Sequence, residues 1–126
     1  MRATLVAAAI AAGLLAAPAL AVEEADFTAA TTGDLVQLCS VQPGEPLYAE
    51  ARQFCYGYIG GAAHFHRALV QGGDRFAPVA CPEGQVSRQE IVAVFLDWAE
   101  AHPELMNELP VEGLMRAAAA EWPCNR

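Results

Sequence analysis

The chain has 126 residues, and its seven arginines against fifteen acidic residues give a formal net charge of −8 at pH 7. Such an acidic surface repels phosphate groups and anionic lipid headgroups, which argues against nucleic-acid binding. A basic protein partner would fit it better, and the competing interpretation is that the charge keeps an exported protein soluble. A chain of this length forms one domain with a modest core, and small exported domains often add disulfides to such a core.

Residues 1–21 are predicted to be a secretory signal peptide. Arg2 supplies the positive start, residues 5–15 form an apolar run, and Ala19-Leu20-Ala21 matches the small-x-small pattern that signal peptidase cuts. The apolar run is shorter than the ~20 residues that a membrane span requires. We therefore expect a periplasmic protein, cleaved after Ala21 and not held in the membrane. Its mature chain keeps six arginines against fifteen acids, a net charge of −9.

The mature chain is predicted to begin with a loose leader. Residues 22–31 are acidic and lack a helical apolar stripe, so we place a single helical domain at residues 32–126. Thr32-Gly33-Asp34 supplies N-cap residue types and predicts a short helix. Its buried face is expected to hold Leu35, Leu38 and Cys39.

A long helix is predicted from about Tyr48 to Val70, after a turn-rich connector at residues 42–46. Gly60 and Gly61 lie inside it, although each glycine costs a helix about 1 kcal/mol relative to alanine. This pair predicts that another backbone passes close by. The expected buried face follows helical spacing and consists of Ala51, Cys55, Tyr58, Ile59, Ala62, Phe65 and Leu69.

Two further helices are predicted after an irregular loop. Ser87 and Glu90 have the spacing of a capping box, and the third helix continues through an apolar stripe to Pro103. The fourth helix begins near Pro110 and ends before Pro123. Its inward residues are expected to be Leu114, Met115, Ala118 and Trp122. No segment alternates with period two, so the expected fold is all-α, a small disulfide-stapled bundle of about four helices.

Cys39, Cys55, Cys81 and Cys124 allow three disulfide pairings. If the third helix returns antiparallel to the second and the fourth reverses again, Cys124 comes back towards Cys81. This topology predicts the pairs Cys39–Cys55 and Cys81–Cys124. There is no CxxC pair and no CxxCH motif, so a zinc, thiol-redox or haem role is disfavoured.

The chain carries no recognisable catalytic or metal-binding pattern. His64 and His66 are two residues apart, so on a helix they face in nearly opposite directions and cannot chelate one ion together. His102 is isolated, and neither a nucleophile elbow nor a glycine-rich phosphate loop is present. We therefore expect no enzymatic activity, no cofactor and no metal.

The connection between the last two helices is the first candidate for a partner-binding surface. It is acidic, contains apolar residues and lacks an obvious core partner. The residues proposed for contact are His102, Glu104, Leu105, Met106 and Glu108. The loop from Gly72 to Ala80 is the second candidate. The competing interpretation is that both segments merely connect helices.

Several short motifs, taken in order, resemble one protein family. They are Gly33-Asp34-Leu35 with Leu38-Cys39, Cys55 with Tyr58-Ile59 and Gly61, Cys81-Pro82 with Gly84 and Ser87, His102-Pro103-Glu104, and Trp122-Pro123-Cys124. Together, over residues 32–124, they resemble the Rap1a/Tai family of immunity proteins. The resemblance implies a periplasmic, disulfide-bonded helical protein that binds a peptidoglycan amidase toxin of type VI secretion and blocks its active cleft. It implies no catalysis by this chain, and it transfers the fold rather than the binding surface.

Two other functions remain open on the sequence. One is a stand-alone periplasmic binding or structural module without a toxin partner. The other is an acid-stress chaperone of the HdeA type, since fifteen acidic groups would permit charge loss at low pH. Two disulfides would resist the unfolding that such a chaperone needs. The sequence also leaves open whether the protein forms a homodimer.

Overall fold

The computed structural model describes residues 21–73 and 75–125, which form helices and no strands. The all-α fold predicted from the sequence is therefore confirmed for the described residues. The signal-peptide prediction concerns residues that lie outside this range, apart from Ala21. The elements, in chain order, are the 3-10 helix η1 (Glu24–Thr28), α1 (Thr32–Ser40), α2 (Tyr48–Gln71), α3 (Arg88–Ala101), the 3-10 helix η2 (Pro103–Leu105) and α4 (Pro110–Glu121).

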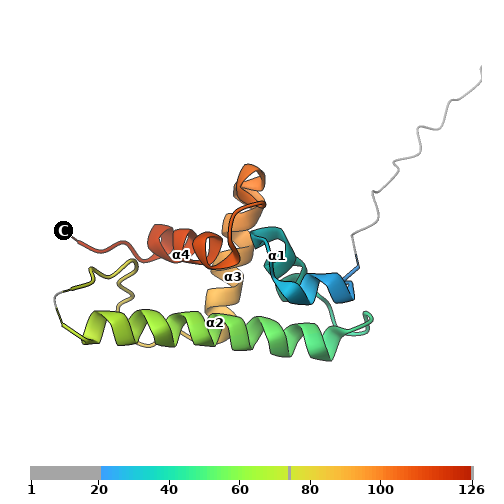
Figure 1. The fold of residues 1–126 in the computed structure, drawn as a ribbon, viewed down its shortest axis with the longest axis horizontal. Helices are drawn as coiled ribbons and strands as arrows, with labels where there is room; N and C mark the ends of the chain where they lie inside the picture. The colour runs from blue at the N-terminus through green and yellow to red at the C-terminus, as the bar shows by residue number, and fades with distance from the viewer. Residues whose placement is uncertain (1–20, 74, 126) are drawn as a thin grey trace, which may run out of the picture.

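The long helix α2 forms one side of the molecule, and Figure 1 shows α1 and α4 lying over its two halves. The prediction that α3 returns antiparallel along α2 is wrong, because α3 crosses α2 and extends beyond α1 and α4 (Figure 1). The reason lies in the core. Phe95, in the middle of α3, is fully buried in one cluster with residues of α1, α2 and α4. Helix α3 contacts α4 and α1 as well as α2, so α2 alone does not set its direction.

The main core takes at least one buried side chain from each α-helix. Leu35, Ile59, Phe95 and Leu114 are its large members, joined by Cys55 and Ala117. These positions agree with the predicted buried faces except Ala117, which was not predicted, whereas the predicted Met115, Ala118 and Trp122 are only half-buried. Phe65 does not agree either, because it is 67% exposed. Helix α2 is covered by α1 and α3, so the face predicted to be buried is covered only in part.

A close approach between helices exists, but not at the predicted glycines. A β-carbon at Gly61 would meet open space, and one at Gly60 would lie 3.5 Å from Nε of the Arg88 side chain rather than against a backbone. The tight contact is at Gly113 in α4. A β-carbon there would lie 2.5 Å from Cγ2 of Thr32 in α1.

The segment that was expected to be a loose leader contains η1 and packs against the rest of the protein. The side chains of Glu23 and Asp26 each accept a backbone N–H of the other in a capping box. Phe27 makes an edge-to-face contact with Phe54 of α2, with ring centroids 5.7 Å apart. Val22 is only 9% exposed. These apolar side chains dock the segment, although they are too few to form a helical stripe.

Two disulfides link elements that are distant in the chain. Cys39–Cys55 joins α1 to α2, and Cys81–Cys124 joins the loop after α2 to the segment after α4. These are the two pairs expected from the sequence, although α3 does not follow the antiparallel path on which that expectation depended. The backbone N–H of Cys81 also donates to the carbonyl of Trp122 at 2.8 Å.

Candidate partner-binding surface

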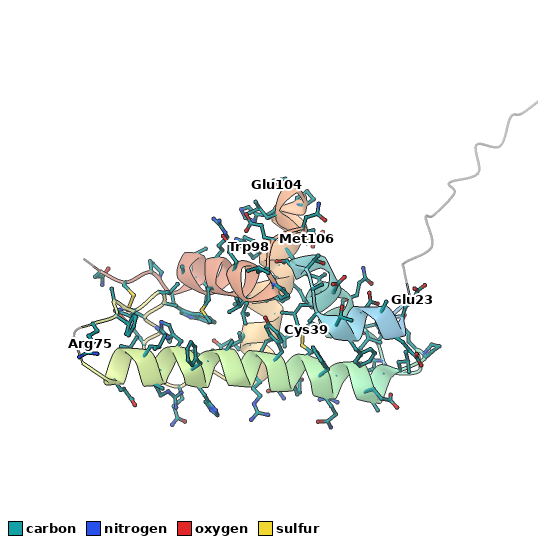
Figure 2. The ribbon with its side chains drawn as sticks, viewed as in Figure 1. Glu23, Cys39, Arg75, Trp98, Glu104 and Met106 are labelled. Carbon is teal, nitrogen blue, oxygen red and sulfur yellow. A yellow bond between two sulfur atoms is a disulfide. The ribbon has the colours of Figure 1, made fainter. Side chains whose placement is uncertain are left out.

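The connection between α3 and α4, residues 102–109, lies at the end of α3 that is furthest from α2. Figure 2 shows Glu104 at its outer tip and Met106 on the side towards α1. The short helix η2 begins at Pro103, where the missing N–H and fixed φ suit a helix start. As Figure 2 shows, this part of the chain projects from the body of the protein.

The connection is held by the first turn of α1, so the prediction that it lacks a core partner is wrong. The backbone N–H of Gly33 donates to the Met106 carbonyl at 2.9 Å, and that of Thr32 donates to the Glu108 carbonyl at 2.7 Å. The fully buried Thr32 hydroxyl lies 3.1 Å from the same carbonyl and 3.0 Å from that of Leu109. The first N–H groups of a helix have no partner within the helix, and here the connection provides acceptors for them.

His102 is the C-cap residue of α3 and packs against the last turn of this helix. Its ring stacks on Trp98 with centroids 4.7 Å apart, and its Nδ1 lies 2.7 Å from the Trp98 carbonyl oxygen. The side chain is half-buried. These contacts give His102 a structural role at the base of the connection.

Glu108 is engaged within the protein. One carboxylate oxygen lies 3.0 Å from Nε of Arg116, and Arg116 also reaches Glu112 at 2.8 Å. The hydrogen bond with Glu112 and the nearby charge of Glu108 raise the pKa of Arg116 above its usual value. A partner would have to compete with this pair in order to use the Glu108 carboxylate.

Four residues on this part of the surface are exposed to solvent, and we call them the outer edge: Glu104, Asn107, Leu109 and Val111. Leu109 is 62% exposed and Val111 is 42% exposed, and Glu104 and Asn107 are also exposed. Leu105 and Met106 are half-buried. The structure thus brings the five predicted contact residues to one place but leaves only Glu104 fully available. It adds Val111, which sequence reasoning missed because helical spacing gives no sign that a neighbouring element will leave a residue uncovered.

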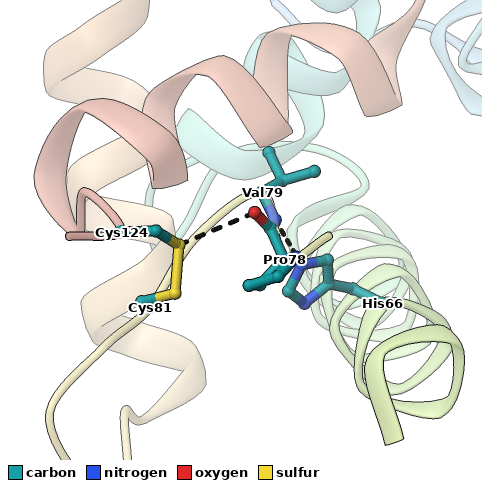
Figure 3. The surroundings of a disulfide bond; sticks show 5 residues. All are labelled: His66, Pro78, Val79, Cys81 and Cys124. Carbon is teal, nitrogen blue, oxygen red and sulfur yellow. Dashed lines mark hydrogen bonds between the residues drawn. A yellow bond between two sulfur atoms is a disulfide. The ribbon is translucent and has the colours of Figure 1, made fainter. Parts of the chain in front are cut away.

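Contacts with α2 and with the segment after α4 hold the second half of the loop of residues 72–80. The backbone N–H of Val79 donates to Nε2 of His66 on α2 at 2.9 Å, and Sγ of Cys124 lies 3.6 Å from the Pro78 carbonyl oxygen (Figure 3). Phe76 and Val79 are nevertheless about half exposed, at 53% and 47%. This second candidate is therefore a supported loop that presents apolar side chains.

In the described part of the chain, no group of three or more His, Cys, Asp or Glu side chains is arranged to hold a metal ion. The search for membrane spans over the same residues finds no helix with the length and apolar character to cross a bilayer. His66 serves the loop, and His102 serves the end of α3.

These features define a small helical protein that two disulfides hold together and that has exposed apolar and acidic side chains on its surface. The model of the Rap1a immunity proteins matches residues 31–124, and the chain belongs to this family. Proteins of this family are inhibitors rather than enzymes, and membership indicates an immunity protein whose partner is a secreted protein toxin. Comparison with curated proteins and with solved structures gives no match.

Proposed function

We propose that this protein is a periplasmic immunity protein that neutralises a peptidoglycan amidase delivered by type VI secretion. The observation that carries the proposal is the family match over residues 31–124, which includes all four α-helices. The amidase target and the periplasmic location come from the resemblance of the sequence motifs to the Rap1a/Tai family. Both disulfides are compatible with an oxidising compartment such as the periplasm.

The outer edge is the surface that we assign to the toxin. It projects from the body, which suits insertion into a concave active cleft. Its backbone is held by the hydrogen bonds from Thr32 and Gly33, so little conformational freedom is lost on binding. Leu109 and Val111 supply exposed apolar area, and Glu104 supplies a charge at the tip that is suited to a basic cleft rim.

The test begins with the genes beside this one, among which the proposal expects a secreted amidase. The purified amidase should bind the mature immunity protein, and its hydrolysis of peptidoglycan should stop when the two are mixed in equal amounts. Export of the amidase to the periplasm should lyse cells unless this protein is co-expressed with a functional signal sequence. Absence of binding together with undiminished hydrolysis would contradict the proposal.

The surface assignment needs separate variants. Glu104→Arg and Leu109→Asp should each weaken toxin binding by at least about tenfold, because each changes an exposed residue of the outer edge. Glu50→Arg is the matched control, since Glu50 is an exposed acid in the first turn of α2. Full inhibition by both outer-edge variants would exclude this surface while leaving the immunity function intact.

A further inference from the structure

A groove lies between the C-terminal half of α2 and α4, and its third wall is formed by residues 78, 80–82 and 84–86. Its volume is about 590 Å³, within the range of ligand sites. It shares no lining residue with the outer edge. Arg88 at the first residue of α3 lines the groove, whereas Glu104 at the tip of the outer edge follows the last residue of α3, about 20 Å along that helix. The apolar part of the lining includes Ile59, Val70, Leu114, Ala118 and Trp122.

The charge of the groove is opposite to that of the chain. Among the described residues that line it there is no Asp or Glu, although the chain has fifteen acidic residues. Two arginines, Arg67 and Arg88, do line it, together with His64 and with His66, whose Nε2 accepts the Val79 N–H. Both ion pairs among the described residues involve Arg116, so neither Arg67 nor Arg88 forms one with a described carboxylate.

Arg88, His64 and Arg67 form a row along one edge of α2. The Arg88 guanidinium packs on Gly60, with its carbon 3.7 Å from the place where a β-carbon would be. His64 and Arg67 follow Gly60 by four and seven residues, so the three positions lie on successive turns of one helix face. The row is about 10 Å long, from the rise of an α-helix. A ligand with a single carboxylate could contact only part of it.

Hydrogen bonds and a disulfide hold the walls of the groove in place before any ligand binds. The Val79 N–H donates to Nε2 of His66, the Cys81 N–H donates to the Trp122 carbonyl, and the Cys81–Cys124 disulfide links the loop to the segment after α4 (Figure 3). Val79, between the lining residues Pro78 and Ala80, is 47% exposed. The apolar surface thus continues outside the groove, where a small molecule would not cover it but a protein segment would.

We propose that this groove docks an acidic amphipathic helix of a protein partner. Carboxylates at positions i, i+4 and i+7 of that helix would face the row formed by Arg88, His64 and Arg67. Apolar side chains on the adjacent face would enter the floor of the groove. Recognition of an amphipathic helix by an apolar groove is a recurring mode of peptide binding, and bidentate contacts from arginine to carboxylate add specificity. The site goes beyond the proposed immunity function, because it does not overlap the outer edge.

The probe is a synthetic, fluorescently labelled helical peptide with glutamates at i, i+4 and i+7 and leucines on the adjacent face. Fluorescence anisotropy with the full mature protein should show saturable binding at micromolar peptide. Arg67→Glu and Arg88→Glu should each weaken binding by about tenfold. Arg52→Glu is the control, because Arg52 is an exposed arginine of the same helix that does not line the groove, and it should leave the affinity unchanged.

Replacing the three glutamates of the peptide by glutamine removes all three carboxylates and should abolish binding. Circular dichroism and the thermal midpoint establish that each variant folds. If a charge-reversal variant does not fold, Arg67→Gln or Arg88→Gln is used in its place. Lack of saturable binding, or equal binding of the glutamine peptide, would overturn the proposal. Light scattering that shows a dimer lost in Arg67→Glu and Arg88→Glu would also overturn it, by assigning the groove to a second copy of this chain.

Discussion

Thr32 in α1 packs directly against the backbone of Gly113 in α4, in the space that any other side chain at position 113 would need. Its Cγ2 and Oγ1 atoms lie 2.5 and 2.6 Å from where that β-carbon would be placed. Thr32 is also completely buried and bonded to the α3–α4 connection. This pair therefore sets both the distance between two helices and the position of the outer edge.

Gly113→Ala should lower the free energy of unfolding by about 1–3 kcal/mol, because the added methyl group forces Thr32 or a helix to move. Helix propensity alone would predict the opposite sign, a gain of about 1 kcal/mol. Urea denaturation decides between the two. Gly61→Ala is the control. It is also within a helix but faces open space, so it should stabilise the protein by about 0.5–1 kcal/mol.

Thr32→Val should lower the free energy of unfolding by about 1–2 kcal/mol, because it keeps the shape of the side chain and removes the hydroxyl donor to Glu108 and Leu109. Amide exchange at Thr32 and Gly33 should become faster as the connection loosens. Thr32→Ser retains the hydroxyl and should keep slow exchange despite the lost methyl group. Equal exchange rates in the two variants would show that the hydroxyl does not hold the connection.

Removal of either disulfide should destabilise the protein. The loop-entropy relation gives about 3 kcal/mol for Cys39–Cys55 and about 4 kcal/mol for Cys81–Cys124, whose sequence separations are 16 and 43. Paired substitutions by alanine, compared by thermal denaturation, test both values. The Cys81–Cys124 variant should also lose affinity for the acidic peptide, since that bridge holds a wall of the groove. An unchanged thermal midpoint after complete reduction would contradict a stabilising role.

Stability at alkaline pH should depend on Tyr58. Burial raises the pKa of its phenol above the usual value near 10, and a backbone hydrogen bond from Val111 lowers it by a smaller amount. Because the folded-state pKa is the higher one, Tyr58 contributes stability that is complete below pH ~10 and is lost as the pH rises through the raised pKa. Denaturation at several pH values should show this loss, and Tyr58→Phe should reduce it. An identical alkaline profile in both proteins would refute the assignment.

The local features of this fold could be predicted from the sequence. The start of α3 follows from Ser87, whose side chain accepts the Glu90 N–H. The start and end of α4 follow from Pro110 and Pro123, and the burial of Leu35 and Leu38 in α1 follows from helical spacing. These features depend on residues within one or two turns of each other, which periodicity and capping rules describe. The expected cap of α1 at Thr32 or Asp34 is wrong, because Thr31 is the N-cap and Thr32 is buried.

The long-range features could not be predicted. Hydrogen bonds between Thr32 and the carbonyls of Glu108 and Leu109 join residues 76 and 77 positions apart, and no local pattern marks such a pair. The crossing of α3 and the groove beside α2 depend on how helices pack together rather than on any one helix. The sequence located the α3–α4 connection as a candidate surface, but only the packing shows that Glu108 and His102 are engaged and that Leu109 and Val111 are exposed.

The Cys81–Cys124 bridge has a consequence for proteolysis. Any single cut of the backbone between these two cysteines leaves the two pieces covalently joined, and this interval contains α3, the projecting connection and α4. The exposed residue Asn107 lies in the projecting connection within this interval, where a protease can reach the chain. A nicked chain would therefore retain α4 beside its core partners and would run as one species until reductant is added. In an environment rich in proteases, the bridge would extend the working life of the protein beyond the first cut.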